Sequence, residues 1–194
     1  SLRLADLHSG RRLHELSFDL PVAHTGRAVR ASALASAFRR DPHKRFGSNY
    51  AARLETLDIH SRGFLTGSID LVFTDGDDLA TARWWVADWK SNWIGERDGG
   101  GQPLYCGPRH YTQSAMEEQM LQHHYPLQAH LYLVALHRFL RWRLVDYSPD
   151  RHLGGYAYVF LRGVSERGGS GVILEPAPLQ RLERLNQLLQ GTQP

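Results

Sequence analysis

The clearest pattern in the chain is a pair of apolar segments separated by a turn. Residues 63–74 and 81–91 are rich in residues that favour strands, and Asp75-Gly76-Asp77-Asp78 between them has the composition of a turn. Two strand-like segments joined by a short turn pair readily in antiparallel fashion. The pattern therefore predicts a β-hairpin over residues 63–91.

Three further segments have the pattern of strands. Residues 13–22 alternate apolar and polar positions up to Pro21, and residues 172–175 form a short run suited to a sheet edge. Residues 155–162 are apolar at odd and even positions alike, which is typical of a strand covered on both faces. We therefore expect residues 155–162 to lie in the interior of the sheet.

Helical spacing of apolar residues marks four other segments. They are residues 31–40, 111–123, 127–143 and 179–189, and Pro126 suits the first turn of the third. Helices interleave with strands without strict alternation, so the order predicts one α/β domain over residues 1–194, with a mixed central sheet flanked by helices. Five glycines and two prolines between residues 95 and 108 predict an exposed connection.

Composition narrows the class of protein without identifying it. The chain has 194 residues, 42% hydrophobic and 22% charged, as ordinary globular domains do. Its longest apolar runs are too short to cross a bilayer, and no secretion signal stands at its start, so no membrane role is expected. The only cysteine, Cys106, excludes an internal disulfide and a cysteine-ligated cluster, and a reducing cytoplasm is the expected compartment.

Positive charge gathers in one stretch, although the formal net charge is only +3. Residues 26–50 hold six Lys or Arg residues against one Asp, a local charge of +5. Arg39, Arg40, Lys44 and Arg45 within this stretch are candidates for contacts with nucleic-acid phosphates. A solvated helix and loop would have the same composition, so charge alone leaves both interpretations open.

The predicted hairpin also contains the residues best suited to chemistry. Asp70 and Asp88 lie within apolar stretches of its two strands, so we expect both carboxylates to be buried or nearly so. A buried carboxylate is costly without a partner, and a divalent cation such as magnesium would relieve that cost. Lys90 shares a strand face with Asp88, because strand side chains repeat with period two. There it could orient or deprotonate a water molecule that attacks a phosphate.

Simpler structural roles explain the same residues. Asp88 and Lys90 could form a partly buried ion pair, Asp70 could cap a turn, and short motifs of this kind often match by chance. Gln128 and Tyr132 are spaced to share one face of a helix, where they could be ordinary polar residues. The residues alone therefore leave a site and a structural network as alternatives.

Taken together, Asp70, Asp88-Trp89-Lys90 and Gln128-x-x-x-Tyr132 resemble the PD-(D/E)xK nucleases of the RecB family. The resemblance extends over residues 63–73, 88–93, 111–113, 124–128, 136–140 and 160–164. It implies a restriction-endonuclease-like core and magnesium-dependent hydrolysis of DNA, with one or two ions that manganese can replace. It further implies a bacterial cytoplasm, single-stranded DNA as substrate, and a RecBCD-type machine with RecC- and RecD-like subunits and the helicase part of RecB as partners.

The same resemblance implies a role for each residue of the motif. Asp70, Asp88 and the backbone carbonyl of Trp89 would bind the metal, and Lys90 would be the catalytic lysine. The supporting motif near the bound strand would be Gln128 and Tyr132.

The chain differs from the family pattern in two places. No G-x-x-x-x-G-K-[S/T] phosphate loop occurs, so we expect a nuclease piece without the helicase part. The family takes a metal-binding histidine from a helix that we expect to lie upstream of Ser1, and none of the eleven histidines matches it. Glu15 resembles the acid on the first core strand of the family, although a surface charge at a strand edge explains it equally well.

Three hypotheses follow from these observations. The first is an active nuclease with little base specificity. The second is a catalytically weak or inactive module of the same fold that binds DNA or a partner subunit. The third is a sequence-specific enzyme of the restriction type.

Overall fold

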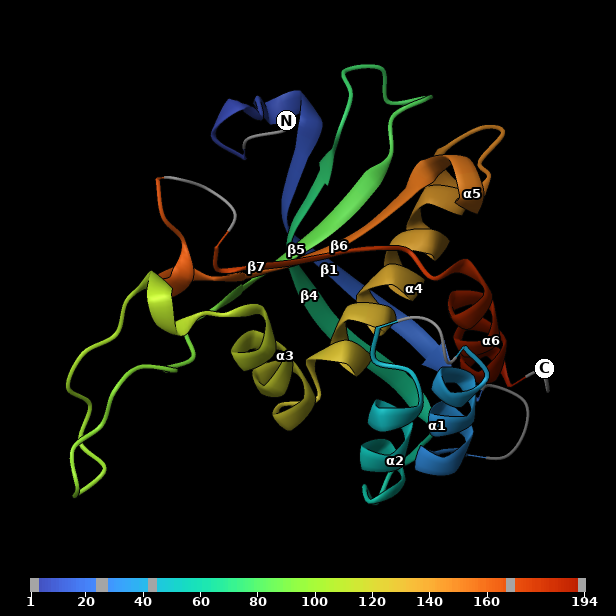
Figure 1. Cartoon of the computed structure of the whole chain (residues 1–194). Coiled ribbons are helices and arrows are strands. Elements are labelled where there is room, and N and C mark those ends of the chain that lie inside the picture. The colour runs from blue at the N-terminus through green and yellow to red at the C-terminus, as the bar shows by residue number, and fades with distance from the viewer. Residues whose placement is uncertain (1–3, 24–27, 42–44, 167–169, 192–194) are drawn as a thin grey trace.

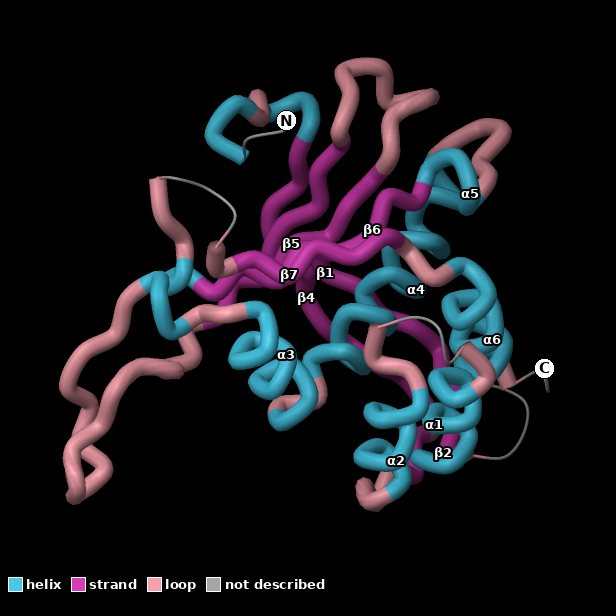
Figure 2. Tube along the Cα trace, viewed as in Figure 1, coloured by secondary structure: helices cyan, strands magenta, loops and turns pink. Residues whose placement is uncertain are grey.

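The computed structural model describes residues 4–23, 28–41, 45–166 and 170–191, and its centre is a five-stranded mixed sheet (Figures 1 and 2). The strands, in spatial order, are β1 (Arg12–Val22), β4 (Gly63–Thr74), β5 (Trp84–Lys90), β6 (Leu153–Phe160) and β7 (Val172–Pro176). The pair β5–β6 is parallel, and the pairs β1–β4, β4–β5 and β6–β7 are antiparallel. The predicted hairpin, the first strand and the edge position of β7 are thus confirmed.

Helices cover the sheet and one another. They are α1 (Ala31–Arg39), α2 (Ser48–Glu55), α3 (Gln113–Gln122), α4 (Tyr125–Arg143), α5 (Pro149–His152) and α6 (Leu179–Gln190). Figure 1 shows α4 against the sheet, where it contacts β5 and β6, while α6 contacts α4 and β1, and α1 contacts α6. The four predicted helices and the α/β fold class with a mixed central sheet are confirmed. Within the described ranges, no helix is long and apolar enough to span a membrane.

The sequence did not predict α2 or the two-stranded sheet of β2 (Val29–Arg30) and β3 (His60–Ser61). An eight-residue helix makes only about two turns, too few for an apolar periodicity to stand out. Isolated helices of that length are also marginal in water. Tertiary burial stabilises it, since Tyr50, Ala51 and Leu54 are fully buried and α2 packs against α1.

Both faces of the sheet carry apolar clusters, of unequal size. The main core includes Tyr156, Tyr158 and Phe160 of β6 together with α4. A smaller cluster holds residues of the opposite face and of the N-terminal 3-10 helix region: Leu7, Leu71, Phe73, Ala87 and Ala157. Every residue of β6 is buried, which confirms the interior position expected for residues 155–160. The prediction was wrong for Leu161 and Arg162, which are exposed and lie in a 3-10 helix that follows the strand.

The side chains of β4 switch between the two faces of the sheet at Asp70. Ile69 packs in the main core, whereas Leu71 and Phe73, which would share its face in a regular strand, pack in the smaller cluster. Glu15 lies opposite Asp70, between the pairs His14–Leu71 and Leu16–Ile69, and has a φ of 50°. This left-handed backbone is uncommon for glutamate, and strain of this kind clusters at functional sites.

A buried arginine ties α6 to α4 and to the chain after α1. Arg181 is 1% exposed, and its guanidinium donates to the backbone oxygens of Arg45 at 3.2 Å and Asp41 at 3.1 Å. Its Nη1 also lies 3.2 Å from Nε2 of His130. Because Nδ1 of His130 lies 2.6 Å from the carbonyl oxygen of Pro126, Nδ1 is the protonated nitrogen and Nε2 accepts from Arg181.

This arrangement predicts a pH-dependent stability. Burial, reinforced by the charge of Arg181, lowers the pKa of His130 to about 3. The folded state thus holds this imidazole neutral, so its stabilising contribution is complete above the unfolded pKa near 6.5 and is lost as the pH falls toward 3. We expect this residue to reduce the free energy of unfolding by up to about 1.4 kcal/mol per pH unit below about pH 6. Urea denaturation of the wild type and of His130→Gln checks this, and equal pH slopes would contradict it.

Candidate active site

Strand β5 and helix α4 bring four of the predicted catalytic side chains into contact. Nζ of Lys90 lies 2.6 Å from Oδ2 of Asp88 and donates to Oε1 of Gln128 at 2.9 Å. Nε2 of Gln128 donates in turn to the hydroxyl of Tyr132 at 3.0 Å. Asp88 is 4% exposed and Lys90 9%, so this network is largely removed from water. The ion pair that the sequence left open is present, and it lies within a larger network.

Two tyrosines that the sequence analysis missed complete the surroundings of Lys90. The hydroxyl of Tyr158 donates to Oε1 of Gln128 at 2.9 Å, and Nζ of Lys90 lies 3.8 Å from the ring centre of Tyr125 and 5.0 Å from that of Tyr158. Ring faces attract an ammonium group, more so when it is shielded from water. The available signals were the position of Tyr125 three residues before Gln128 and the alternation along β6, which places Tyr158 beside Asp88.

Asp70 reaches the same region through an interruption of the sheet. The pairing of β4 with β5 ends at Leu71–Ala87, although the same register would place Asp70 opposite Asp88. The backbone N–H of Trp89 instead donates to Oδ2 of Asp70 at 3.0 Å. The carboxylate therefore bonds to a neighbouring strand, so the idea that Asp70 caps a turn is wrong. Asp70 is half-buried, whereas Asp88 is buried as expected.

The electrostatics of Asp88 favour a cation beside it. Burial raises the pKa of Asp88, the hydrogen bond and charge of Lys90 oppose this rise, and the charge of Asp70 adds to it. Oδ2 of Asp88 is buried and makes an ion pair with the ammonium of Lys90 at 2.6 Å. A bound cation would further offset the cost of burying Asp88 and its repulsion by the charge of Asp70.

Asp70 and Asp88 are a donor set that fits magnesium. This ion is commonly held by one or two carboxylates, with water and substrate phosphates filling the remaining positions. In the part of the chain that the structure describes, no group of three or more His, Cys, Asp or Glu side chains could hold a metal. Glu15, opposite Asp70 in register, is exposed and does not join such a group. Water or substrate would therefore have to complete the coordination shell.

Tyrosine hydroxyls at the site keep their protons. Burial, together with the charge of Asp88, raises the pKa of Tyr132 to about 12, and burial raises the pKa of Tyr158 well above its usual range. At neutral pH both groups are therefore hydrogen-bond donors and not anions.

Asn92 helps to hold the chain that follows Lys90 in place. The backbone oxygen of Asn92 accepts from the hydroxyl of Tyr111 at 2.7 Å, and its Oδ1 accepts from the hydroxyl of Tyr125 at 3.2 Å. The same Tyr125 ring lies over Lys90. These bonds join the end of β5 to the start of α4 and so help to position the lysine.

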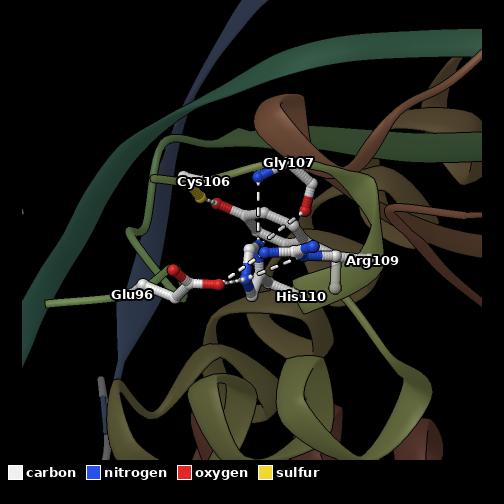
Figure 3. Close-up of polar contacts among 6 residues, drawn as sticks. Glu96, Cys106, Gly107, Arg109 and His110 are labelled. Carbon is white, nitrogen blue, oxygen red and sulfur yellow. Dashed lines mark hydrogen bonds and ion pairs between the residues drawn. The ribbon is translucent and has the colours of Figure 1, made fainter. Parts of the chain in front are cut away.

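The sequence predicts an exposed connection over residues 95–108. In the structure this segment, which lies beyond Asn92, forms an extended arm (Figures 1 and 2). Its two sides are joined by backbone hydrogen bonds between Glu96 and both Leu104 and Tyr105. At its base the carboxylate of Glu96 pairs with Arg109 and His110 (Figure 3).

The basic residues predicted to contact phosphates have different partners in the structure. Arg39 pairs with Glu55 at 2.7 Å, and Arg45 pairs with Glu175 at 2.6 Å. Arg40 is exposed, and Lys44 lies outside the described residues. Contacts of these residues with DNA stay a prediction.

The fold and the site together define a class. Two carboxylates and a lysine lie on adjoining strands of a mixed sheet, below a helix that bears a Gln–Tyr pair, as in the core of PD-(D/E)xK nucleases.

Comparison with known proteins identifies the family. No family model matches the chain. The chain is 37% identical over 94% of its length to "RecBCD enzyme subunit RecB" of Mycolicibacterium smegmatis. It is 39% and 37% identical, each over 84% of its length, to the proteins of that name from Mycobacterium tuberculosis and Escherichia coli. The chain spans only 17%, 14% and 12% of the lengths of these three relatives. The chain belongs to the RecB family, as a homologue of its nuclease domain.

The network around Lys90 predicts that Gln128 is also structurally important. Gln128→Leu would leave the buried ammonium and the hydroxyl of Tyr158 without their shared acceptor. We expect the free energy of unfolding to fall by about 1–3 kcal/mol, the cost of buried polar groups without partners. Gln122→Leu, at an exposed position of α3, is the matched control and should change stability by less than about 0.5 kcal/mol. Equal losses in the two variants, measured by chemical denaturation, would contradict the assigned role.

Proposed function

We propose that this chain is the nuclease domain of a RecB-type protein and hydrolyses phosphodiester bonds of DNA with the help of magnesium. The observation that carries the proposal is the buried Asp88–Lys90 pair, fixed by Gln128 and adjoined by Asp70. A purely structural ion pair would not require a second carboxylate beside it.

Each side chain has a task that follows from its position. Asp70, Asp88 and the backbone carbonyl of Trp89 would hold the ion. When bound, magnesium would polarise the phosphoryl oxygen and favour deprotonation of a water molecule. The ammonium of Lys90 would orient the attacking water and offset charge that builds on the phosphate.

The helix side of the site would position the lysine and the strand. Gln128 holds Nζ of Lys90 through Oε1, so the ammonium points toward Asp88 without further conformational cost. Tyr132 keeps its hydroxyl proton and can donate a hydrogen bond to the bound strand.

The names of the relatives indicate the complex in which this activity would take place. They describe RecB as a subunit of the RecBCD enzyme. By homology we assign to the whole protein a role in double-strand break repair in the bacterial cytoplasm, with RecC- and RecD-like subunits and the helicase part of RecB as partners. Single-stranded DNA is the proposed substrate. We expect it to be cut without base selection, because phosphate contacts position a strand without reading its sequence.

Digestion of single-stranded DNA tests the assignment directly. Lys90→Met and Asp88→Asn should each lower the cleavage rate in magnesium at least about 100-fold, because each removes a group that acts on the reacting atoms. Asp77→Asn, in the exposed turn between β4 and β5, is the control and should cut like the wild type. A wild-type chain that binds DNA but does not cut it would support the inactive module instead.

Metal binding gives a second test that does not depend on cleavage. Titration calorimetry should detect magnesium binding to the wild type and its loss in Asp70→Asn and Asp88→Asn, since each substitution removes one of two charged donors. The same titration of Asp77→Asn should match the wild type. Unchanged binding in both site variants would show that the ion binds elsewhere.

A further inference from the structure

A hollow lies directly beside the proposed catalytic site, between α4 and the ribbon of β1 and β4. Its volume is about 300 Å³, and Gln128 and Tyr132 form one of its sides. The lining also includes Phe18, Leu65, Thr66, Gly67, His124, Leu127 and Leu131. None of these residues carries an acidic, lysine or arginine side chain, so the hollow does not suit a phosphate group.

An aromatic ring forms one wall of the hollow. Phe18 on β1 is the direct cross-strand partner of Gly67 on β4. A Cβ atom on residue 67 would lie 2.6 Å from Cζ of Phe18, so the glycine makes room for the ring against the backbone of β4. The ring also meets Tyr132 edge to face, with centroids 5.9 Å apart. Phe18 is nonetheless only half-buried, which leaves part of the ring available to a ligand.

The polar side chains of the lining are Thr66 on β4 and, at the start of α4 and along it, His124, Gln128 and Tyr132. His124 precedes the helix with a left-handed φ of 56°, and its Nδ1 lies 3.2 Å from the hydroxyl of Tyr50. Among the described residues its Nε2 has no hydrogen-bond partner. The residues His124, Gln128 and Tyr132 therefore give the hollow a polar side beside its apolar walls.

We propose that this hollow is a subsite for one nucleobase of the DNA strand whose phosphate lies at Asp70, Asp88 and Lys90. The inference rests on the proposed function and adds the position of one base of the bound DNA strand. A base has apolar faces, a polar edge and a link to the phosphate that is to be cut, which matches the walls, the polar groups and the position of the hollow. Stacking on Phe18 accepts every base, because each presents a π face.

Binding of two single-stranded oligonucleotides of equal length tests the subsite without any cleavage. One is a thymidine oligonucleotide, and the other has abasic linkages throughout; both are titrated with the full chain in EDTA and followed by fluorescence anisotropy. The wild type should bind the thymidine strand about tenfold more tightly than the abasic strand, as expected for a base stacked on an aromatic ring. Equal affinities for the two strands would overturn the proposal.

Variants that fill the hollow locate the effect. Leu131→Phe on α4 and Leu65→Phe on β4 enlarge half-buried residues of two opposite walls, and each should reduce the preference to below about twofold. Leu188→Phe, at a half-buried position of α6 away from the lining, should retain the preference. A preference that survives in both filled variants, with folding verified by circular dichroism, would overturn the assignment of this hollow.

The outcomes separate the subsite from the nuclease activity. Lys90→Met should retain the preference for the thymidine strand while cleavage is lost. Cleavage of both strands at equal affinity would refute the subsite and leave the nuclease proposal standing. A base preference in a chain that never cuts DNA would support the subsite and refute the nuclease proposal.

Discussion

A buried ammonium group is the constraint on which the site depends. Lys90 is almost completely shielded from water, and such a charge is tolerable only with close partners of opposite charge or with acceptors. Asp88 lies on the same strand, Gln128 comes from α4, and the ring of Tyr158 comes from β6. The parallel register of β5 with β6 and the packing of α4 on both strands are therefore conditions for keeping this lysine charged and oriented.

The second feature of the site is the interruption of the sheet at Asp70. On one side the hydrogen-bonded pairing with β5 stops, and on the other side Glu15 has a left-handed backbone. A regular ladder would satisfy more backbone groups, so the interruption costs stability locally. In return the carboxylate of Asp70 bonds to the N–H of Trp89, at the end of β5 that bears Asp88 and Lys90. The strained backbone and the proposed metal ligands coincide, as is common where function opposes stability.

The basic stretch shows how the same charges can have a structural purpose. Arg45 pairs with Glu175 of β7, and its backbone oxygen accepts from the buried Arg181 of α6. Arg39 is paired with Glu55 across α1 and α2. Composition records six basic residues and one acidic residue over this stretch, but acids outside it pair with two of the six, Arg39 and Arg45. Local charge is therefore weak evidence for a phosphate-binding surface.

By itself the sequence determined the elements whose pattern is local. The hairpin of β4 and β5, the fully buried β6 and the long α4 follow from periodicity, and the common face of Asp88 and Lys90 follows from the pleat. Only the tertiary structure decided what those residues touch. The tyrosines around Lys90, the bond from Trp89 to Asp70, the hollow beside Phe18 and the short helix α2 depend on contacts between segments far apart in the chain. Periodicity reports which side of an element is buried, whereas strand register and helix packing decide which side chains meet there.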